Sequence, residues 1–389
     1  MKKDFSPAEK KLIGGMGLLM GIRMLGVSMI IPVFSIFATG IGGSTHELAG
    51  VAVGIYGISQ TIFQIPLGRL SDRWGRKQAT LLGLAIFFIG TVLSGLSTNI
   101  YHLIVSRFIA GAGAVSGITM AWLTDGIDTD RRNAALSLAG ISIGAAVIAG
   151  FTLSPAIAGY LGIPYLFHTC AAITLVSILF TMKYLENHRT NGADGEGQSL
   201  KIRNVALILK NPDILRLNAA GLVGNMSLTG MFFIMPLLIK EEFGLLSMWK
   251  IYVPMALTGT VCMYFFGRQA DRIGTVRIAA AGFAFEIAGA LLPLVSRGPA
   301  ALIAAFMLFY VGHCIISPVL PAAVSKHPSE EHRGTVMGIF NSSQFIGSGL
   351  GGLACGILYS FSPDCIFLCI TVVILILLYA FSGFRNYSS

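Results

Sequence analysis

Long apolar stretches, separated by short polar and charged intervals, follow one another along all 389 residues of the chain. A stretch of about 20 uncharged residues crosses a hydrocarbon core of ~30 Å as a helix. Membrane strands would instead alternate apolar and polar residues, and runs such as 370–381 are apolar almost throughout. The pattern predicts an all-α polytopic membrane protein with twelve transmembrane helices. Their expected cores are residues 13–38, 48–68, 78–96, 100–124, 134–159, 163–183, 216–239, 248–267, 277–296, 299–324, 334–360 and 364–384.

The widest polar interval divides these spans into six and six. We expect an N-terminal six-helix bundle at 1–185, a cytoplasmic central loop at 186–213 and a C-terminal six-helix bundle at 214–389. An internal repeat supports this division, because Gly68-Arg-Leu-Ser-Asp-Arg-Trp-Gly75 reappears 199 residues later as Gly267-Arg-Gln-Ala-Asp-Arg-Ile-Gly274. A parallel repeat of six spans, with a binding site near the midplane between the halves, is typical of rocker-type secondary transporters.

Charge is scarce and unevenly distributed. Only 12% of the residues are charged, against about 25% in soluble domains, which excludes a soluble enzyme. With the N-terminus placed inside, cytoplasmic segments hold 22 of the 27 Lys and Arg residues, as the positive-inside rule requires. The net charge of +9 therefore indicates membrane orientation rather than nucleic-acid binding. We expect a multi-pass protein of the cell (inner) membrane with both termini cytoplasmic and no cleavable signal peptide.

Motifs for other chemistry are missing from the sequence. No GxxxxGK[ST] run occurs, so ATP is not expected as the direct energy source. None of the six cysteines forms a CxxC pair, so we expect neither a metal site nor a disulfide. We predict no enzymatic activity and no cofactor, with energy from a proton gradient. The expected partners are a small-molecule substrate, protons and membrane lipid, and we expect a monomer.

Three motifs resemble signatures of the major facilitator superfamily. Gly68-Arg-Leu-Ser-Asp72-Arg73-Trp-Gly75-Arg76-Lys77 is similar to its loop 2-3 signature. Leu103-x-x-x-Arg107-x-x-Ala110-Gly111-x-Gly113 resembles a motif of the twelve-span drug:proton antiporter branch, with Ala110 in place of the usual Gln. Gly150-x-x-x-Ser154-Pro155-x-x-Ala158-Gly159 resembles that branch's antiporter motif with two Gly positions altered. Further segments, such as Arg23-Met-Leu-Gly26, are similar to YajR-type efflux transporters, and the resemblance covers essentially the whole chain.

The loop motif suggests a conformational latch at the cytoplasmic side. We expect Asp72 to cap the positive N-terminus of span 11 near Gly334, worth about 0.3 to 1 kcal/mol at an exposed site, and Arg76 to pair with Asp125. The resemblance implies that these contacts hold the cytoplasmic side closed in the outward-facing state. The candidate latch residues are Gly68, Asp72, Arg73, Gly75, Arg76, Asp125, Asp271 and Arg333.

Four ionisable residues inside spans need a reason, because each charge costs roughly 2.5 to 3.5 kcal/mol at the centre of a bilayer. Arg107, through the resemblance, and Glu286 and His313, as titratable groups, are candidates for proton coupling. Arg23 lies about 15 Å into span 1 and is a candidate contact for an anionic substrate or for a carboxylate. Structural alternatives stay open: hydrogen bonds to neighbouring helices for Arg23 and His313, and a lipid-facing position for Glu286.

Polar residues at helical spacing are candidates to line a central cavity together with Arg23. These are Tyr56, Gln60 and Gln64 in span 2, Asn225 in span 7, and Asn341 and Gln344 in span 11. Phe232, Phe233, Phe265, Phe345 and several methionines would give an apolar wall suited to lipophilic ligands, or would pack in the core.

The sequence favours a secondary transporter that exports lipophilic small molecules by proton-coupled alternating access. Gly150, Pro155 and Gly159 would belong to its antiporter-motif helix. Span 1 lacks an acidic residue, which argues against cationic drugs. The alternatives are uptake or exchange of a small anionic or zwitterionic metabolite, favoured by Arg23, flipping of an amphiphile or lysolipid, and a sensor without transport activity.

Overall fold

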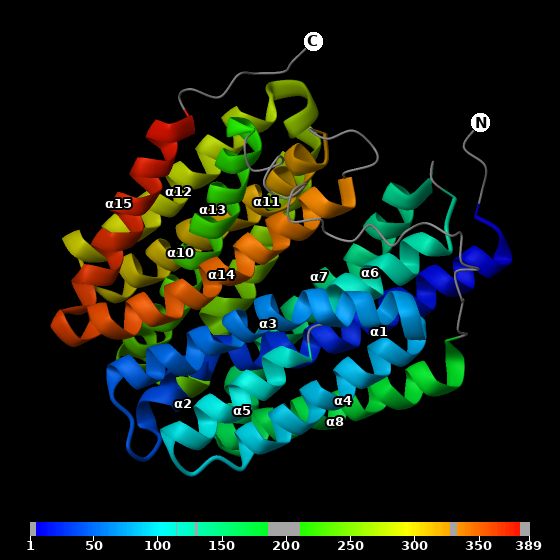
Figure 1. The fold of residues 1–389 in the computed structure, drawn as a ribbon. Helices are drawn as coiled ribbons and strands as arrows, with labels where there is room; N and C mark the ends of the chain where they lie inside the picture. The colour runs from blue at the N-terminus through cyan, green and yellow to red at the C-terminus, as the bar shows by residue number, and fades with distance from the viewer. Residues whose placement is uncertain (1–4, 114, 129–130, 186–210, 327–332, 382–389) are drawn as a thin grey trace. The chain divides into compact units, whose positions relative to one another are not determined.

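The computed structural model describes residues 5–113, 115–128, 131–185, 211–326 and 333–381. The side chains of a few further residues, among them Asp271 and Arg333, are not described. Within these ranges twelve helical segments are long and apolar enough to cross a membrane (Figure 1). The twelve predicted spans are therefore confirmed, and most of the helices extend beyond the predicted cores at one or both ends.

The first half of the chain contributes eight helices to six spans. They are α1 (Pro7–Ile30), α2 (Phe34–Gly40), α3 (His46–Trp74), α4 (Arg76–Gly95), α5 (Ile100–Ala112), α6 (Ser116–Asp125), α7 (Arg132–Tyr160) and α8 (Ile163–Tyr184).

The second half contributes one helix to each described span. They are α10 (Pro212–Phe243), α11 (Trp249–Ile273), α12 (Thr275–Val295), α13 (Pro299–Lys326), α14 (Arg333–Phe361) and α15 (Pro363–Phe381).

Spans 1 and 4 are interrupted, whereas the sequence predicted continuous helices there. A 3-10 turn at Ile31–Val33 separates α1 from α2, and its Pro32 lacks the N–H that an α-helix needs. In span 4, α5 ends at Ala112 and α6 begins at Ser116. The second interruption leaves the N-terminus of a helix inside a span.

The internal repeat is visible in the turns. Gly75, between α3 and α4, has φ of 99°, and Gly274, between α11 and α12, has φ of 101°. Positive φ is readily accessible only to glycine, and these two glycines are 199 residues apart in the sequence. The glycine that ends the predicted repeat therefore has a similar φ in both halves.

Contacts divide the chain into two compact units. Residues 1–33 and 59–197 form the first unit, and residues 34–58 and 198–389 form the second. The predicted domains follow chain order, but segment 34–58 has its contacts with the C-terminal half. The start of α3 packs on α14, where a Cβ added at Gly50 would lie 2.6 Å from Gly356 Cα and one at Gly57 would lie 2.7 Å from Phe345 O.

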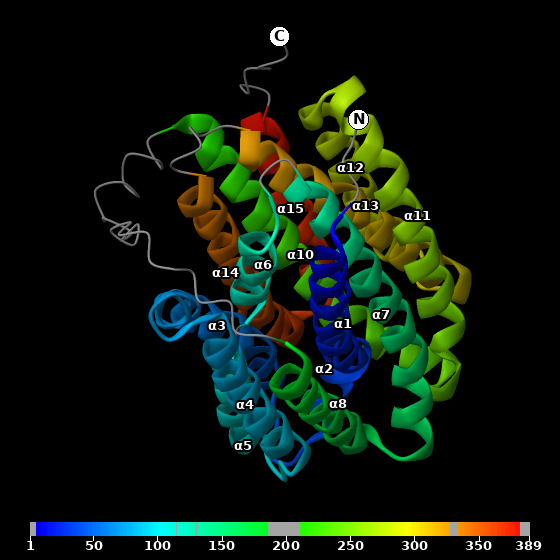
Figure 2. The same cartoon turned by 90° about the vertical axis from the view of Figure 1, so that its right-hand side faces the viewer.

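Glycines let helix backbones approach closely in both units. In the first unit α1 and α7 run side by side (Figure 2), and the Ser28 hydroxyl donates to Ala146 O at 3.2 Å. In the second unit, a Cβ added at Gly312 of α13 would lie 2.8 Å from the Glu286 nitrogen of α12. Packing at small residues is the main source of helix association in lipid, because lipid tails are as apolar as the side chains.

Replacing Gly312 with alanine is expected to destabilise the second unit. The added methyl group has no space against the Glu286 backbone, and overpacking costs about 1 to 3 kcal/mol. Thermal unfolding of the purified protein in detergent should show a lowered midpoint. Gly140→Ala is the matched control, because a Cβ added at Gly140 meets nothing within 4 Å. An unchanged midpoint for Gly312→Ala would contradict this packing.

Candidate functional site

Glu286 and His313 meet inside the second unit. Glu286 lies on α12 and His313 on α13, and His313 Nδ1 is 3.1 Å from Glu286 Oε1. The Glu286 side chain is 0% exposed and the His313 side chain 16%. Glu286 Oε2 is buried and has no hydrogen-bond partner among the described residues. The sequence singled out both residues separately, and the structure brings them together as one buried pair.

The packing of α12 against α13 creates this pair. Gly312 precedes His313 and lies against the Glu286 backbone, so the two side chains enter the same space. Phe283 and Phe309 are fully buried on the same two helices. His313 contacts Glu286 of the neighbouring helix, and Ser317, four residues after His313 on α13, is exposed. An imidazole and a carboxyl group at this distance can share or exchange one proton.

The other two in-span charges lie in the first unit. Arg23 of α1 is partly buried, lines a cavity and has no hydrogen-bond acceptor for its Nε among the described residues. Arg107 lies on α5, beside the contact between α4 and α5. Ala110, at the motif position that usually holds Gln, packs against α4: a Cβ added at Gly90 would lie 2.6 Å from Ala110 Cα.

The predicted cavity-lining residues of spans 2, 7 and 11 lie on α3, α10 and α14. Gln60 is buried and Gln64 is partly buried on α3, in the first unit, and Tyr56 belongs to the part of α3 in the second. Asn225 donates to Gly221 O of its own helix at 3.2 Å. The remaining two, Asn341 and Gln344, are partly buried on α14.

Sequence reasoning missed Asn218. This residue is 4% exposed and links α10 to α14, because Ser343 donates to its Oδ1 at 3.2 Å. Its amide also donates to Ile214 O at 2.7 Å. An amide inside an apolar span was a signal that could have identified it, as it identified Asn225.

The predicted aromatic wall is only partly buried. Phe232 packs edge-on against Phe306, with ring centroids 5.1 Å apart, and Phe233 is buried. Phe265 is 55% exposed, and Phe345 is partly buried. The first two rings belong to the core of the second unit.

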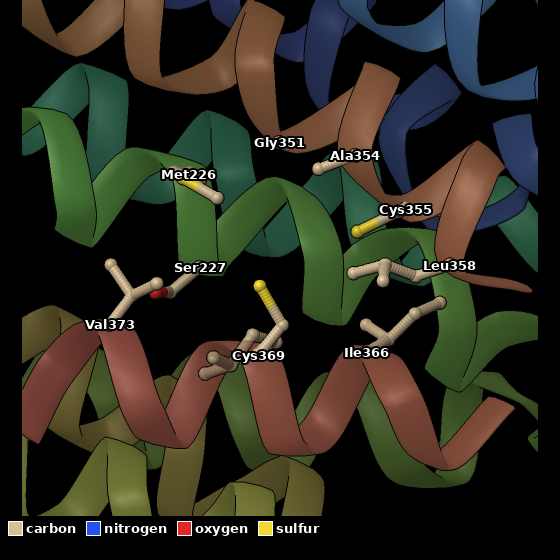
Figure 3. Close-up of a pocket in the computed structure, with 10 residues that line it drawn as sticks. Met226, Ser227, Gly351, Ala354, Cys355, Leu358, Ile366, Cys369 and Val373 are labelled. Atoms are coloured by element: carbon tan, nitrogen blue, oxygen red, sulfur yellow. The ribbon is translucent and has the colours of Figure 1, made fainter. Parts of the chain in front are cut away.

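A small gap between α10, α14 and α15 is too small for a substrate. Its volume is about 10 Å³, and its lining includes Ser227, Cys355 and Cys369 (Figure 3). A void of this size holds at most one water molecule.

The six cysteines are free thiols, and no group of three His, Cys, Asp or Glu residues that could hold a metal occurs in the described ranges.

The predicted contact between Arg76 and Asp125 is present. Arg76 Nε donates to Asp125 Oδ2 at 2.8 Å, and Arg76 Nη1 contacts Asp72 Oδ1 at 2.7 Å. Ser71 Oγ accepts a third hydrogen bond at 3.0 Å. Gly75 makes the turn that brings α4 back toward α3. One guanidinium therefore joins the ends of three helices, α3, α4 and α6.

Of the remaining latch residues, Gly68 and Arg73 have described surroundings. Gly68 is partly buried, with open space where a Cβ would be, and Arg73 is exposed. Asp271 is the third-last residue of α11, and Arg333 begins α14. Their side chains lie outside the described atoms, and so does Gly334, so the proposed cap on span 11 stays a prediction.

Other cations at the same end of the first unit bind carbonyl or carboxylate oxygens. Arg132 Nε donates to Thr124 O at 2.9 Å, at the end of α6. Arg131 pairs with Glu9 at 2.8 Å and with Asp128, and Lys77 donates to Met182 O at 2.9 Å. Cations are stabilised near helix C-termini. These contacts anchor the ends of the helices in this unit.

The antiporter-motif helix is α7. Gly150 packs directly on Ser28 of α1, Pro155 is inside the helix, and Gly159 is exposed. Ser154, at one of the altered glycine positions, is fully buried, and its hydroxyl has no partner among the described residues.

A double-mutant cycle on Arg76→Met and Asp125→Asn is expected to give a coupling energy of about 0.5 to 1 kcal/mol. The pair is 16% and 27% exposed, so screening by water is incomplete. The measurement is unfolding of purified protein in detergent. The control cycle is Arg297→Met with Asp364→Asn, a pair that is 47% and 42% exposed and should show coupling near zero. Equal coupling energies in both cycles would contradict the prediction that Arg76 and Asp125 interact more strongly than the exposed pair.

Comparison with known proteins identifies the family. The model of the family described as "Major Facilitator Superfamily" matches residues 16–352 and 255–387 of this chain. The inner membrane transport protein YajR of Escherichia coli (strain K12) is 31% identical over 351 residues, 89% of this chain and 77% of that protein. Multidrug resistance protein 2 of Bacillus subtilis (strain 168) is 24% identical over 363 residues, 87% of this chain and 86% of that protein. The solved structure of the nucleoside transporter NupG has a TM-score of 0.79 at 14% identity, covering 96% of this chain and all of that one. This chain is therefore a multi-pass membrane transporter, and it belongs to the Major Facilitator Superfamily.

Proposed function

We propose that this transporter exports lipophilic small molecules across the inner membrane in exchange for protons. Both termini are then cytoplasmic, in agreement with the excess of Lys and Arg in the loops that this orientation places inside. The buried contact between Glu286 and His313 is the observation that carries the proposal. The similarity to Multidrug resistance protein 2 supports the direction of transport.

The proton-binding pair has one buried and one accessible member. Glu286 has no exposed surface, and His313 has some, so a proton reaches Glu286 through the imidazole. A buried carboxylate costs several kcal/mol unless it is fully paired, and only one oxygen of Glu286 has a partner among the described residues. The number of protons held by the pair therefore depends on access to water. Alternating access changes that access from one side of the membrane to the other.

The contacts of Arg76 support a second part of the mechanism. Arg76 contacts both Asp72 and Asp125 within the first unit. A conformational change that draws Asp72 toward the N-terminus of span 11 would therefore compete with the contact between Arg76 and Asp72. The latch then opens and closes by exchanging partners for one carboxylate. No cofactor or metal takes part, and the working unit is a monomer in membrane lipid.

A second candidate function is uptake or exchange of a small anionic metabolite. The specific observation in its favour is the position of Arg23, whose Nε has no hydrogen-bond acceptor among the described residues. Export of an anion and uptake of an anion differ in direction only, so the same binding site serves both. Transport in vesicles of known orientation distinguishes them.

Glu286→Gln is expected to reduce substrate-driven proton movement at least ten-fold, because the amide cannot take up a proton at neutral pH. The assay uses purified protein in liposomes with an internal pH-sensitive dye. The added compounds are a lipophilic cation, a neutral drug, an organic anion and a lysolipid. His313→Asn should slow the proton signal without abolishing substrate binding. Ser317→Ala is the matched control, because Ser317 lies one turn from His313 and is exposed.

Two results would refute this mechanism. Unchanged proton movement in Glu286→Gln would remove Glu286 as the carrier. Transport without proton movement in the unmodified protein, for every compound tested, would refute proton coupling itself.

A further inference from the structure

The first unit contains a cavity of about 130 Å³ between α1, α4, α6 and α7. An engineered cavity of about 150 Å³ in another protein binds benzene, so this one accommodates a single ring or a short branched chain. Leucine, valine and isoleucine contribute to the wall. Its distinctive lining residues are Met20, Arg23, Met24, Ser116, Thr119 and Met120.

Arg23 supplies an uncompensated positive charge to this cavity. A guanidinium group stays charged in proteins, and its placement inside a span costs free energy. Among the described residues it has no carboxylate partner, and its buried Nε has no acceptor. Arg76, Arg131, Arg216 and Arg297, in contrast, each pair with an aspartate. The guanidinium donors of Arg23 therefore favour an anionic group from outside the protein.

The interruption in span 4 adds hydrogen-bond donors to the lining of the cavity. Val115 and Ser116, at the start of α6, line the same space as Arg23. No side chain caps this N-terminus, and the first turn of a helix has N–H groups without intrahelical acceptors. The N-terminus of a half-helix inside a span attracts anions in other transporters. Arg23 and the start of α6 thus both favour negative charge in this cavity.

The rest of the wall determines what the anion is attached to. Three methionines, Met20, Met24 and Met120, contribute flexible apolar surface that adapts to different shapes. Thr119 is not free to serve as a donor, because its hydroxyl already donates to Val115 O and Ser116 O, both at 3.1 Å. The polar contacts are therefore confined to one part of an otherwise apolar space.

We propose that this cavity binds the carboxylate end of an amphiphilic organic anion, with the carboxylate on Arg23 and the first turn of α6 and an aromatic or branched apolar group among the methionines. The same charge repels cations. As a statement about the transported substrate, this assignment rests on the proposed export function. As a statement about binding, it stands independently of that function.

Three probes of one size test this assignment: benzoate, benzamide and benzamidine, which carry a negative, a neutral and a positive group on the same ring. Binding to the full-length protein in detergent at pH 7.5 is measured by calorimetry. We expect benzoate to bind at least ten-fold more tightly than benzamide, and benzamidine not to bind. Equal affinity for benzoate and benzamide would overturn the proposal.

Variants of Arg23 locate the site. Arg23→Met should abolish the preference for benzoate over benzamide, and Arg23→Lys should retain part of it, because lysine keeps the charge but loses the planar donor geometry. Arg297→Met, the same change at an arginine paired with Asp364 in the other unit, should leave binding unchanged. Benzoate binding that survives Arg23→Met would overturn the proposal. If Arg23→Met does not fold, Arg23→Lys and the three probes on the unmodified protein decide.

The outcome separates binding from transport. Charge-selective binding at Arg23, with no proton movement in liposomes, would refute proton coupling but not the site. Proton movement driven by neutral compounds, without benzoate binding, would refute the site but leave the proposed export function intact.

Discussion

Close approach of helix backbones is the constraint on which the polar interior of this protein depends. Lipid provides no hydrophobic driving force between helices, so they associate where small residues allow contact over a long surface. Between α12 and α13 that contact includes Gly282, Gly289 and Gly312. Glu286 and His313 face each other because the glycines fix the distance between their helices. The contact between Glu286 and His313 is thus a consequence of packing rather than of any local sequence motif.

Charges at the helix ends have partners, whereas two of the charged residues inside the spans keep a buried atom without one among the described residues. Arg76, Arg132 and Lys77 bind carboxylates or the carbonyls of neighbouring helix ends. Their partners lie where water and the helix termini offer acceptors, so these contacts cost little. Arg23 and Glu286 each retain an unpartnered buried atom among the described residues. Incomplete satisfaction at such depth is expensive, and departures from a fully satisfied interior are expected at functional sites.

The interruption of span 4 brings a helix end next to a charge inside a span. A continuous helix from 100 to 124 would satisfy its backbone internally and present only side chains to α1. The observed break places the N-terminus of α6 beside the cavity that Arg23 lines. Irregular backbone in a span is tolerated where it is buried in protein or lines a cavity. Val115 and Ser116, at this break, line the cavity.

The sequence by itself determined the twelve spans, the repeat and the contact between Arg76 and Asp125. The spans and the repeat depend on local requirements: a span must satisfy its own backbone hydrogen bonds in lipid, and the turns at Gly75 and Gly274 need positive φ. The contact between Arg76 and Asp125 joins two helices and was predicted from the loop motif. Only the tertiary structure decided that Glu286 meets His313, that Asn218 meets Ser343, and that Arg23 and Ser116 line one cavity. These contacts depend on how each helix is rotated and tilted, which neighbouring helices determine. Spans that are apolar on almost every face do not encode that rotation in their own hydropathy pattern.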